Sequence, residues 1–87
     1  MWSEGVVGIS QGKNAPTVHV HYWMKRYKEP SKFGIDGGRI SKLTLKIGDE
    51  IVANYDRGWD IRPRNEIAEK VLYILVHEID WREKDEN

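Results

Sequence analysis

The sequence predicts an α+β fold, in which a four-stranded antiparallel sheet carries one C-terminal helix packed on one face. Two observations predict it. Apolar and polar residues alternate in short segments over the first part of the chain, which is typical of half-buried strands. After Trp59 the apolar period lengthens to about 3.6 residues, which is typical of a helix. One helix covers only one face of a sheet, so we expect the other face to be solvated or to meet a partner.

The composition indicates one small non-membrane domain spanning residues 1–87, with a charged tail, 82–87, that we expect to fray. There is no cysteine, so neither disulfides nor thiolate metal sites can form. No apolar run is long enough to cross a bilayer, and no signal peptide is evident. We therefore expect a cytoplasmic protein.

The formal net charge is zero, but the charges are unevenly distributed. Residues 1–48 carry eight Lys or Arg against three Asp or Glu, whereas residues 49–87 carry six against eleven. Two interpretations stay open. The first half offers a basic surface to an anionic partner, or the two halves pair across the fold and solvate their own faces.

The first two predicted strands cover residues 2–10 and 17–27. In the first, Gly5 and Gly8 are expected to weaken or bulge the strand. In the second, the alternation is clean and separates a core-facing set from an outward set. The core-facing set is Val18, Val20, Tyr22 and Met24, and the outward set is His19, His21, Trp23 and Lys25.

A glycine-containing loop, 28–38, leads to the most clearly predicted hairpin, formed by strands 39–47 and 50–55 around Gly48. In the second of these strands, Ile51, Ala53 and Tyr55 are expected to share one face. Irregular loops of this length in compact domains are functional more often than average, so residues 28–38 are a candidate binding segment.

The helix is expected to begin near Pro63, which suits an early helical position. Its apolar stripe consists of Ile67, Ala68, Val71, Leu72, Leu75 and Ile79. Ile74 and Val76 widen that stripe, so we expect the helix to be covered on more than one side, by the sheet and a loop or by a second subunit. A homo-oligomer is therefore expected.

Four residues around the glycine loop and the segment 55–60 could bind a small anionic, nucleotide-like ligand by charge and stacking. They are Arg39, Lys42, Arg57 and Trp59. The glycine amides of 34–38 could assist by cradling a phosphate. A purely structural interpretation stays open, in which the glycines form a turn, Arg57 pairs with Asp36 or Asp60, and Trp59 closes the core.

Trp23 on the outward set marks a candidate protein interface, because Trp is enriched at binding hot spots. A different class of partner is also possible. Residues 25–28 are Lys-Arg-Tyr-Lys, and together with Tyr22, Trp23 and Lys32 they combine charge with aromatic rings, as single-stranded nucleic-acid-binding proteins do. The zero net charge argues against a dedicated nucleic-acid-binding protein.

Two motifs resemble those of a family of short uncharacterised proteins from Gram-positive bacteria and their prophages. They are FGIDGGRISKL at 33–43 and YDRGWD at 55–60, with Pro63 following. The family has no established activity, so no catalytic or binding residue carries over to this chain. The resemblance implies a phage or mobile-element protein that acts on a host component.

Catalytic and metal-binding patterns are absent from the sequence. His19 and His21 lie about 7 Å apart on one strand face, but no third ligand accompanies them, and no cofactor motif is present. No Ser/His/Asp order or paired carboxylates indicate an enzyme. We therefore predict a non-enzymatic binding protein whose partner is a host protein or a small anionic ligand, with single-stranded nucleic acid as the alternative.

Overall fold

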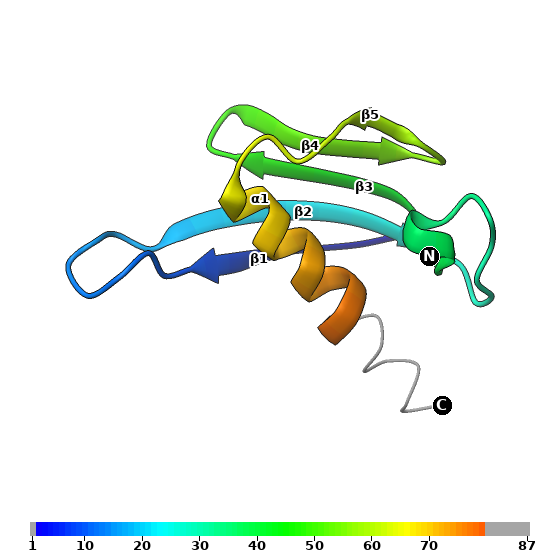
Figure 1. The fold of residues 1–87 in the computed structure, drawn as a ribbon, viewed down its shortest axis with the longest axis horizontal. Helices are drawn as coiled ribbons and strands as arrows, with labels where there is room; N and C mark the ends of the chain where they lie inside the picture. The colour runs from blue at the N-terminus through cyan, green and yellow to red at the C-terminus, as the bar shows by residue number, and fades with distance from the viewer. Residues whose placement is uncertain (1, 80–87) are drawn as a thin grey trace.

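The computed structural model describes residues 2–79 and shows an open antiparallel sheet with a helix on one face (Figure 1). The strands follow the order β1-β2-β3-β4-β5, so each pairs with its neighbour along the chain. They are β1 Trp2–Ile9, β2 Val18–Arg26, β3 Ile40–Ile47, β4 Glu50–Asp56 and β5 Trp59–Ile61. The prediction of four strands is wrong, because the segment between β4 and the helix forms a fifth strand of three residues. The expectation about the tail 82–87 falls outside the described residues.

The pairing of β1 with β2 runs without a register shift, from Trp2 opposite Lys25 to Ile9 opposite Val18. The expected bulge at Gly5 or Gly8 is therefore absent from this pair. Gly5 has a packing role instead, because a Cβ built on it would lie 2.7 Å from the Tyr22 hydroxyl oxygen. The Tyr22 ring occupies the space that a side chain at position 5 would need.

Each of the other three strand pairs contains one extra residue, which is a β-bulge. Ser41 is the extra residue in β3, Val52 in β4 and Asp60 in β5. The bulge in β4 corrects the expected alternation, since Val52 is buried and Ile51 is exposed. A bulge shifts the side-chain alternation by one residue, so a strict period of two misassigns every position beyond it.

The helix α1, Glu66–Tyr73, begins three residues later than Pro63, which lies outside it. The Asn65 side chain caps the helix by accepting a hydrogen bond of 2.8 Å from the Ala68 backbone N–H. Such a cap is worth about 0.5–2 kcal/mol, and it fixes where the helix starts. A π-helical turn, Ile74–Ile79, continues the helix. Within residues 2–79, no helix is long and apolar enough to cross a membrane.

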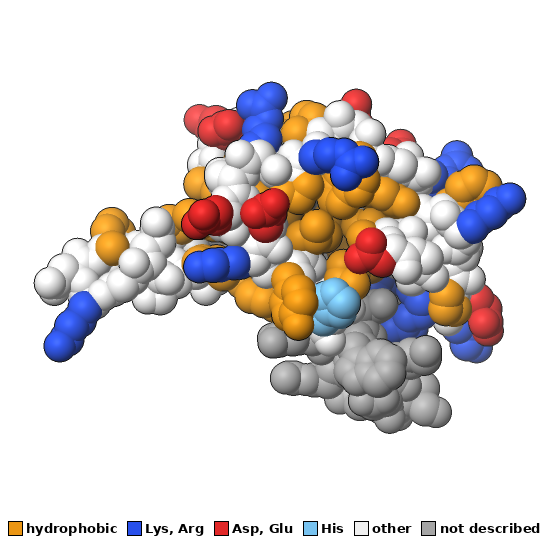
Figure 2. Space-filling model, in the orientation of Figure 1, with side chains coloured by type: hydrophobic (Ala, Val, Ile, Leu, Met, Phe, Trp, Pro, Cys, Tyr) orange, Lys and Arg blue, Asp and Glu red, His pale blue; other side chains and the backbone are white. Residues whose placement is uncertain are grey.

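The helix packs against one face of the sheet, over β1 and β2, and the core lies between the helix and that face (Figure 1). We call the face that carries the helix the covered face and the opposite face the open face. Fully buried side chains of the core include Val20, Met24, Leu43 and Leu45 from the covered face of the sheet and Val71 and Leu75 from the helical segment. Hydrophobic side chains remain visible beside the helix on the covered face (Figure 2). Trp59 and Ile67 are half-buried and pack against the core.

Candidate functional site

The open face carries a mixture of aromatic, cationic and polar side chains, in contrast to the covered face. Strand registers assign its members, because residues directly opposite each other in a ladder project to the same face. They are Trp2, Glu4, Val6 and Gly8 from β1, His19, His21, Trp23 and Lys25 from β2, Lys42, Thr44 and Lys46 from β3, and Ile51, Asn54 and Asp56 from β4. No described element covers this face.

Exposed aromatic rings surround one lysine at the end of β2. The Lys25 ammonium lies 5.9 Å from the centre of the Trp2 ring and 5.3 Å from that of the Tyr27 ring. Trp2 is 58% exposed and Tyr27 is 51% exposed. Together with the neighbouring Trp23, these residues form what we call the aromatic–lysine surface: Trp2, Trp23, Lys25 and Tyr27. The antiparallel register builds it by placing Trp2 directly opposite Lys25.

Trp23 is held in place by a small polar cluster. Its ring stacks on the His21 ring, with centres 4.0 Å apart and planes inclined by 13°. The Nε2 atom of His21 in turn lies 2.6 Å from a carboxylate oxygen of Glu4. Glu4 pairs directly with Trp23 across the β1–β2 ladder, so the carboxylate orients the imidazole against the indole. The outcome is a preorganised flat ring on the open face.

Two further acidic groups, one on the open face and one that contacts it, are each engaged by a neighbour. Asp56 pairs with the Lys42 ammonium at 3.7 Å, and Asp60 accepts a hydrogen bond of 3.2 Å from the Asn54 amide. Among residues 2–79, Lys25 and Lys46 have no carboxylate at ion-pair distance. Both are therefore available to an anionic partner, although the chain as a whole is neutral.

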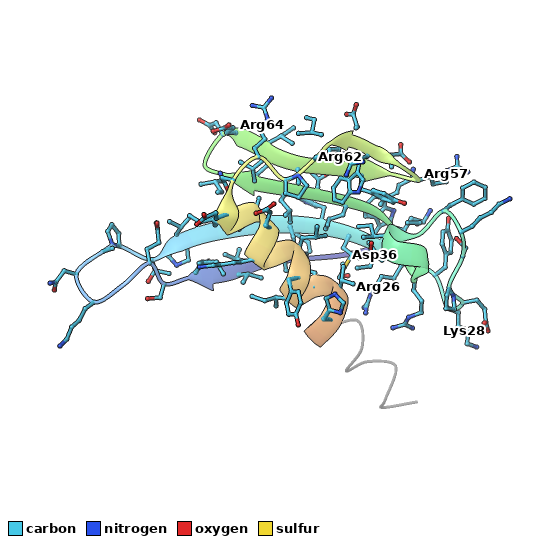
Figure 3. The ribbon with its side chains drawn as sticks, in the orientation of Figure 1. Arg26, Lys28, Asp36, Arg57, Arg62 and Arg64 are labelled. Atoms are coloured by element: carbon cyan, nitrogen blue, oxygen red, sulfur yellow. The ribbon has the colours of Figure 1, made fainter. Side chains whose placement is uncertain are left out.

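The four residues predicted to bind a small ligand are not brought together on one face. Lys42 lies on the open face opposite Asp56, whereas Trp59 pairs with Tyr55 on the covered face. The Trp59 ring meets the Tyr55 ring edge-on, with centres 5.0 Å apart. Arg57 lies at the exposed tip of the β4–β5 hairpin (Figure 3). Arg39 precedes β3 and is half-buried.

The glycine amides of the loop are already used within the chain. The backbone N–H groups of Gly34, Gly37 and Gly38 donate to the carbonyl oxygens of Ser31, Gly34 and Ile35 at 2.9–3.0 Å. The last two bonds form a 3-10 turn, Ile35–Gly37, in which Gly37 adopts a left-handed backbone with φ of 71°. An anion could not be cradled by these three amides while the turn persists.

The two sequence motifs do lie side by side. The Tyr55 hydroxyl donates a hydrogen bond of 2.7 Å to the Phe33 carbonyl. The Arg57 backbone N–H donates one of 2.9 Å to the Ser41 carbonyl. Among the described residues Arg57 forms no ion pair with Asp36 or Asp60, so the motifs are joined through Tyr55 and the backbone.

Trp2 is the site residue that the sequence reasoning missed. It lies far from Lys25 in the chain, and only the unbroken β1–β2 register joins them. The sequence pattern that could have placed Trp2 on the open face is its alternation with Glu4, Val6 and Gly8, since every second residue of a strand lies on the same face. Tyr22, which was grouped with the nucleic-acid candidates, instead lies over Gly5 on the covered face. Among the side chains that the structure describes, 2–77, no three His, Asp or Glu gather as a metal site would require.

Comparison with known protein families gives a match over most of the chain. The model of the family described as Domain of unknown function (DUF7678) matches residues 1–80. The chain belongs to this family. That agrees with the expectation of an uncharacterised family. No curated protein matches and no solved structure matches. The DUF7678 match thus assigns the chain to a family, and any functional statement must come from the geometry of the site.

Proposed function

We propose that this DUF7678 protein binds single-stranded nucleic acid on the open face of its sheet, through the aromatic–lysine surface. One observation carries the proposal: the Lys25 ammonium lies within 6 Å of two aromatic rings that are each more than half exposed. Unpaired bases stack on exposed rings, and a lysine between the rings contacts the phosphates that link those bases. Stacking tolerates any base, so we expect weak sequence preference.

The lysines favour nucleic acid over a protein partner. The buried centre of a protein interface is depleted of Lys, whereas a surface that binds a phosphate backbone needs cations beside the rings. Here the Lys25 ammonium lies within 6 Å of both the Trp2 and the Tyr27 ring, and the Lys32 ammonium in the adjoining loop lies 5.3 Å from the Phe33 ring centre. Single-stranded rather than double-stranded nucleic acid is expected, because rings on a sheet surface reach bases only when the bases are unstacked.

A small nucleotide-like ligand is less well supported by the arrangement of the loop. Two of the residues predicted to bind such a ligand, Lys42 and Trp59, project from opposite faces, and the glycine amides are already hydrogen-bonded within the chain.

We propose further that the protein acts in the cytoplasm of a bacterial host, in a phage or prophage context, as a non-enzymatic factor. The resemblance of 33–43 and 55–60 to prophage proteins supports that context.

The test is fluorescence anisotropy with labelled single-stranded DNA and RNA oligonucleotides of mixed sequence, titrated at several salt concentrations. We expect binding that weakens as salt rises, because phosphate contacts release counterions. Tyr27→Ala should weaken binding by about 5- to 150-fold, which corresponds to about 1–3 kcal/mol per stacked base. Lys25→Gln should reduce the salt slope by about one.

Tyr73→Ala is the matched control, because Tyr73 is 60% exposed but lies on the helix. It should bind like the wild type. Absence of binding to both oligonucleotides at low salt would contradict the proposal, and so would equal losses in the two tyrosine variants. In either case Trp23 would become the candidate hot spot for a host protein.

A further inference from the structure

The two edges of the sheet differ in how they are protected. The β5 edge has only three residues, contains a bulge, and is followed by Arg62 and Pro63. The β1 edge has eight residues and pairs without a shift. It carries no Lys, Arg or Pro, and its one charged residue, Glu4, is engaged with His21. Among residues 2–79, β1 pairs only with β2, so its outer row of backbone groups has no strand partner.

An edge strand of this length without charges or bulges is a template for pairing with another strand. We infer that β1 pairs antiparallel with β1 of a second copy, which makes a continuous ten-stranded sheet from two chains. This inference does not depend on nucleic-acid binding. It commits to a second copy because pairing of β1 with β1 uses both long edges and stops at two chains, with only the short β5 edges left at the ends. Pairing of β1 with the β5 of another chain would instead leave a long β1 edge free to add further copies.

The two-fold axis of such a pair runs perpendicular to the sheet, so open face continues into open face. Residues opposite each other must then share a face, which leaves two registers near the middle of β1. In one, Val6 lies opposite the partner's Val6. In the other, Gly5 lies opposite its own copy, and Val6 lies opposite the partner's Glu4. In both registers position 6 is next to the axis, and Val6 is 58% exposed in the single chain.

Val6→Glu therefore tests the pairing whichever register forms. The new carboxylate lies opposite the same carboxylate of the partner or opposite the partner's Glu4, and like charges directly opposite each other destabilise a ladder. We expect the wild-type chain to sediment at twice its own mass in the absence of nucleic acid, and Val6→Glu to sediment as a monomer. Ile51→Glu is the matched control, because Ile51 is 42% exposed on the same face but lies on the inner strand β4. It should remain a dimer.

A wild-type chain that is monomeric up to high micromolar concentration would overturn the inference, and so would equal dissociation of the two glutamate variants. Hydrogen exchange on the wild-type chain provides a second measurement if Val6→Glu fails to fold. Protection of the β1 amides should rise with protein concentration by more than protection of the β3 amides, because the outer β1 groups become hydrogen-bonded only in the pair. Equal concentration dependence in β1 and β3 would also overturn it. That outcome would leave the nucleic-acid proposal standing, because oligonucleotide binding is measured on the single chain by a different experiment and does not require a second copy.

Discussion

The covered and open faces of one sheet are built from the same strands but from different chemistry. Along β3, Leu43 and Leu45 are buried under the helix, whereas their neighbours Lys42 and Thr44 project to the open face. The helix removes the central side chains of the covered face from water, so apolar contacts there supply the stability. The open face keeps rings and lysines in solvent. Of two side chains adjacent in a strand, one therefore contributes to stability and the other to the binding surface. Substitutions at neighbouring positions should affect stability and binding separately.

The largest effect is expected from a pair of adjacent substitutions in β3. Leu45→Ala removes a side chain that has no exposed surface, which leaves a cavity under the helix and should cost about 2–5 kcal/mol of unfolding free energy. Lys46→Ala, one residue further along, removes an open-face side chain and should change stability by less than about 0.5 kcal/mol. Urea unfolding followed by circular dichroism measures both.

Comparable losses in the two β3 variants would mean that the open face is also packed, for example against a second copy. In that case the loss in Lys46→Ala should depend on protein concentration, because dissociation adds to unfolding. Equal losses that are independent of concentration would contradict the division between the faces.

A smaller contrast is expected between the two glycines of β1. Gly5 lies on the covered face, where an added Cβ would come within 2.9 Å of three Tyr22 atoms, so Gly5→Ala should cost on the order of 1–3 kcal/mol. Gly8 lies on the open face, and the nearest atom to an added Cβ is the Thr17 methyl carbon at 3.2 Å. Because glycine itself weakens a strand, Gly8→Ala should be within about 0.5 kcal/mol of the wild type. Thermal melts of both variants check the contrast, and a larger loss in Gly8→Ala would reverse it.

The sequence predicted the parts of the fold that depend on local periodicity. The core-facing assignment of Val20 and Met24 is confirmed, as are the β3–β4 hairpin and the helix on one face. The bulges were not predictable, because one extra residue leaves no mark in composition. Val52 therefore entered the core in place of Ile51. The strand β5 was missed because three residues are too few to show alternation.

The candidate site was only partly predictable, for a different reason. Trp23 and Lys25 were recognised from one strand, but Trp2 joins them through pairing with a distant segment. Lys42 and Trp59 were grouped because their motifs are close in the chain. Pairing with β4 sends their side chains to opposite faces. Periodicity shows which side chains of one strand share a face. The pairing register decides which side chains of the neighbouring strands lie on that face with them.

The smallest effect is expected from a hydrogen-bonded chain that crosses three strands of the open face. Thr44 Oγ1 donates to the Asn54 side-chain oxygen at 2.8 Å, and the Asn54 amide donates to Asp60 at 3.2 Å. Thr44→Val keeps the branched shape that suits a strand and removes the hydroxyl, so only the hydrogen bond is lost. Because this face is partly wet, water can replace the donor, and the cost should be about 0.5 kcal/mol.

The same substitution at the only other threonine of the chain, Thr17→Val, is the control for the change from hydroxyl to methyl, since Thr17 is exposed. Chemical denaturation of both variants gives the difference between them. A difference above about 1.5 kcal/mol would exceed the usual net contribution of one such bond. It would show that water does not reach Asn54, and that part of the open face is buried by something other than the helix. A second copy paired at β1 could not supply that burial, because it would extend the sheet beyond β1, at the far side from β4 and β5. A small difference would leave the open face as a solvated surface held in shape by its own polar contacts, which is the state in which Trp23 and Lys25 can receive a ligand.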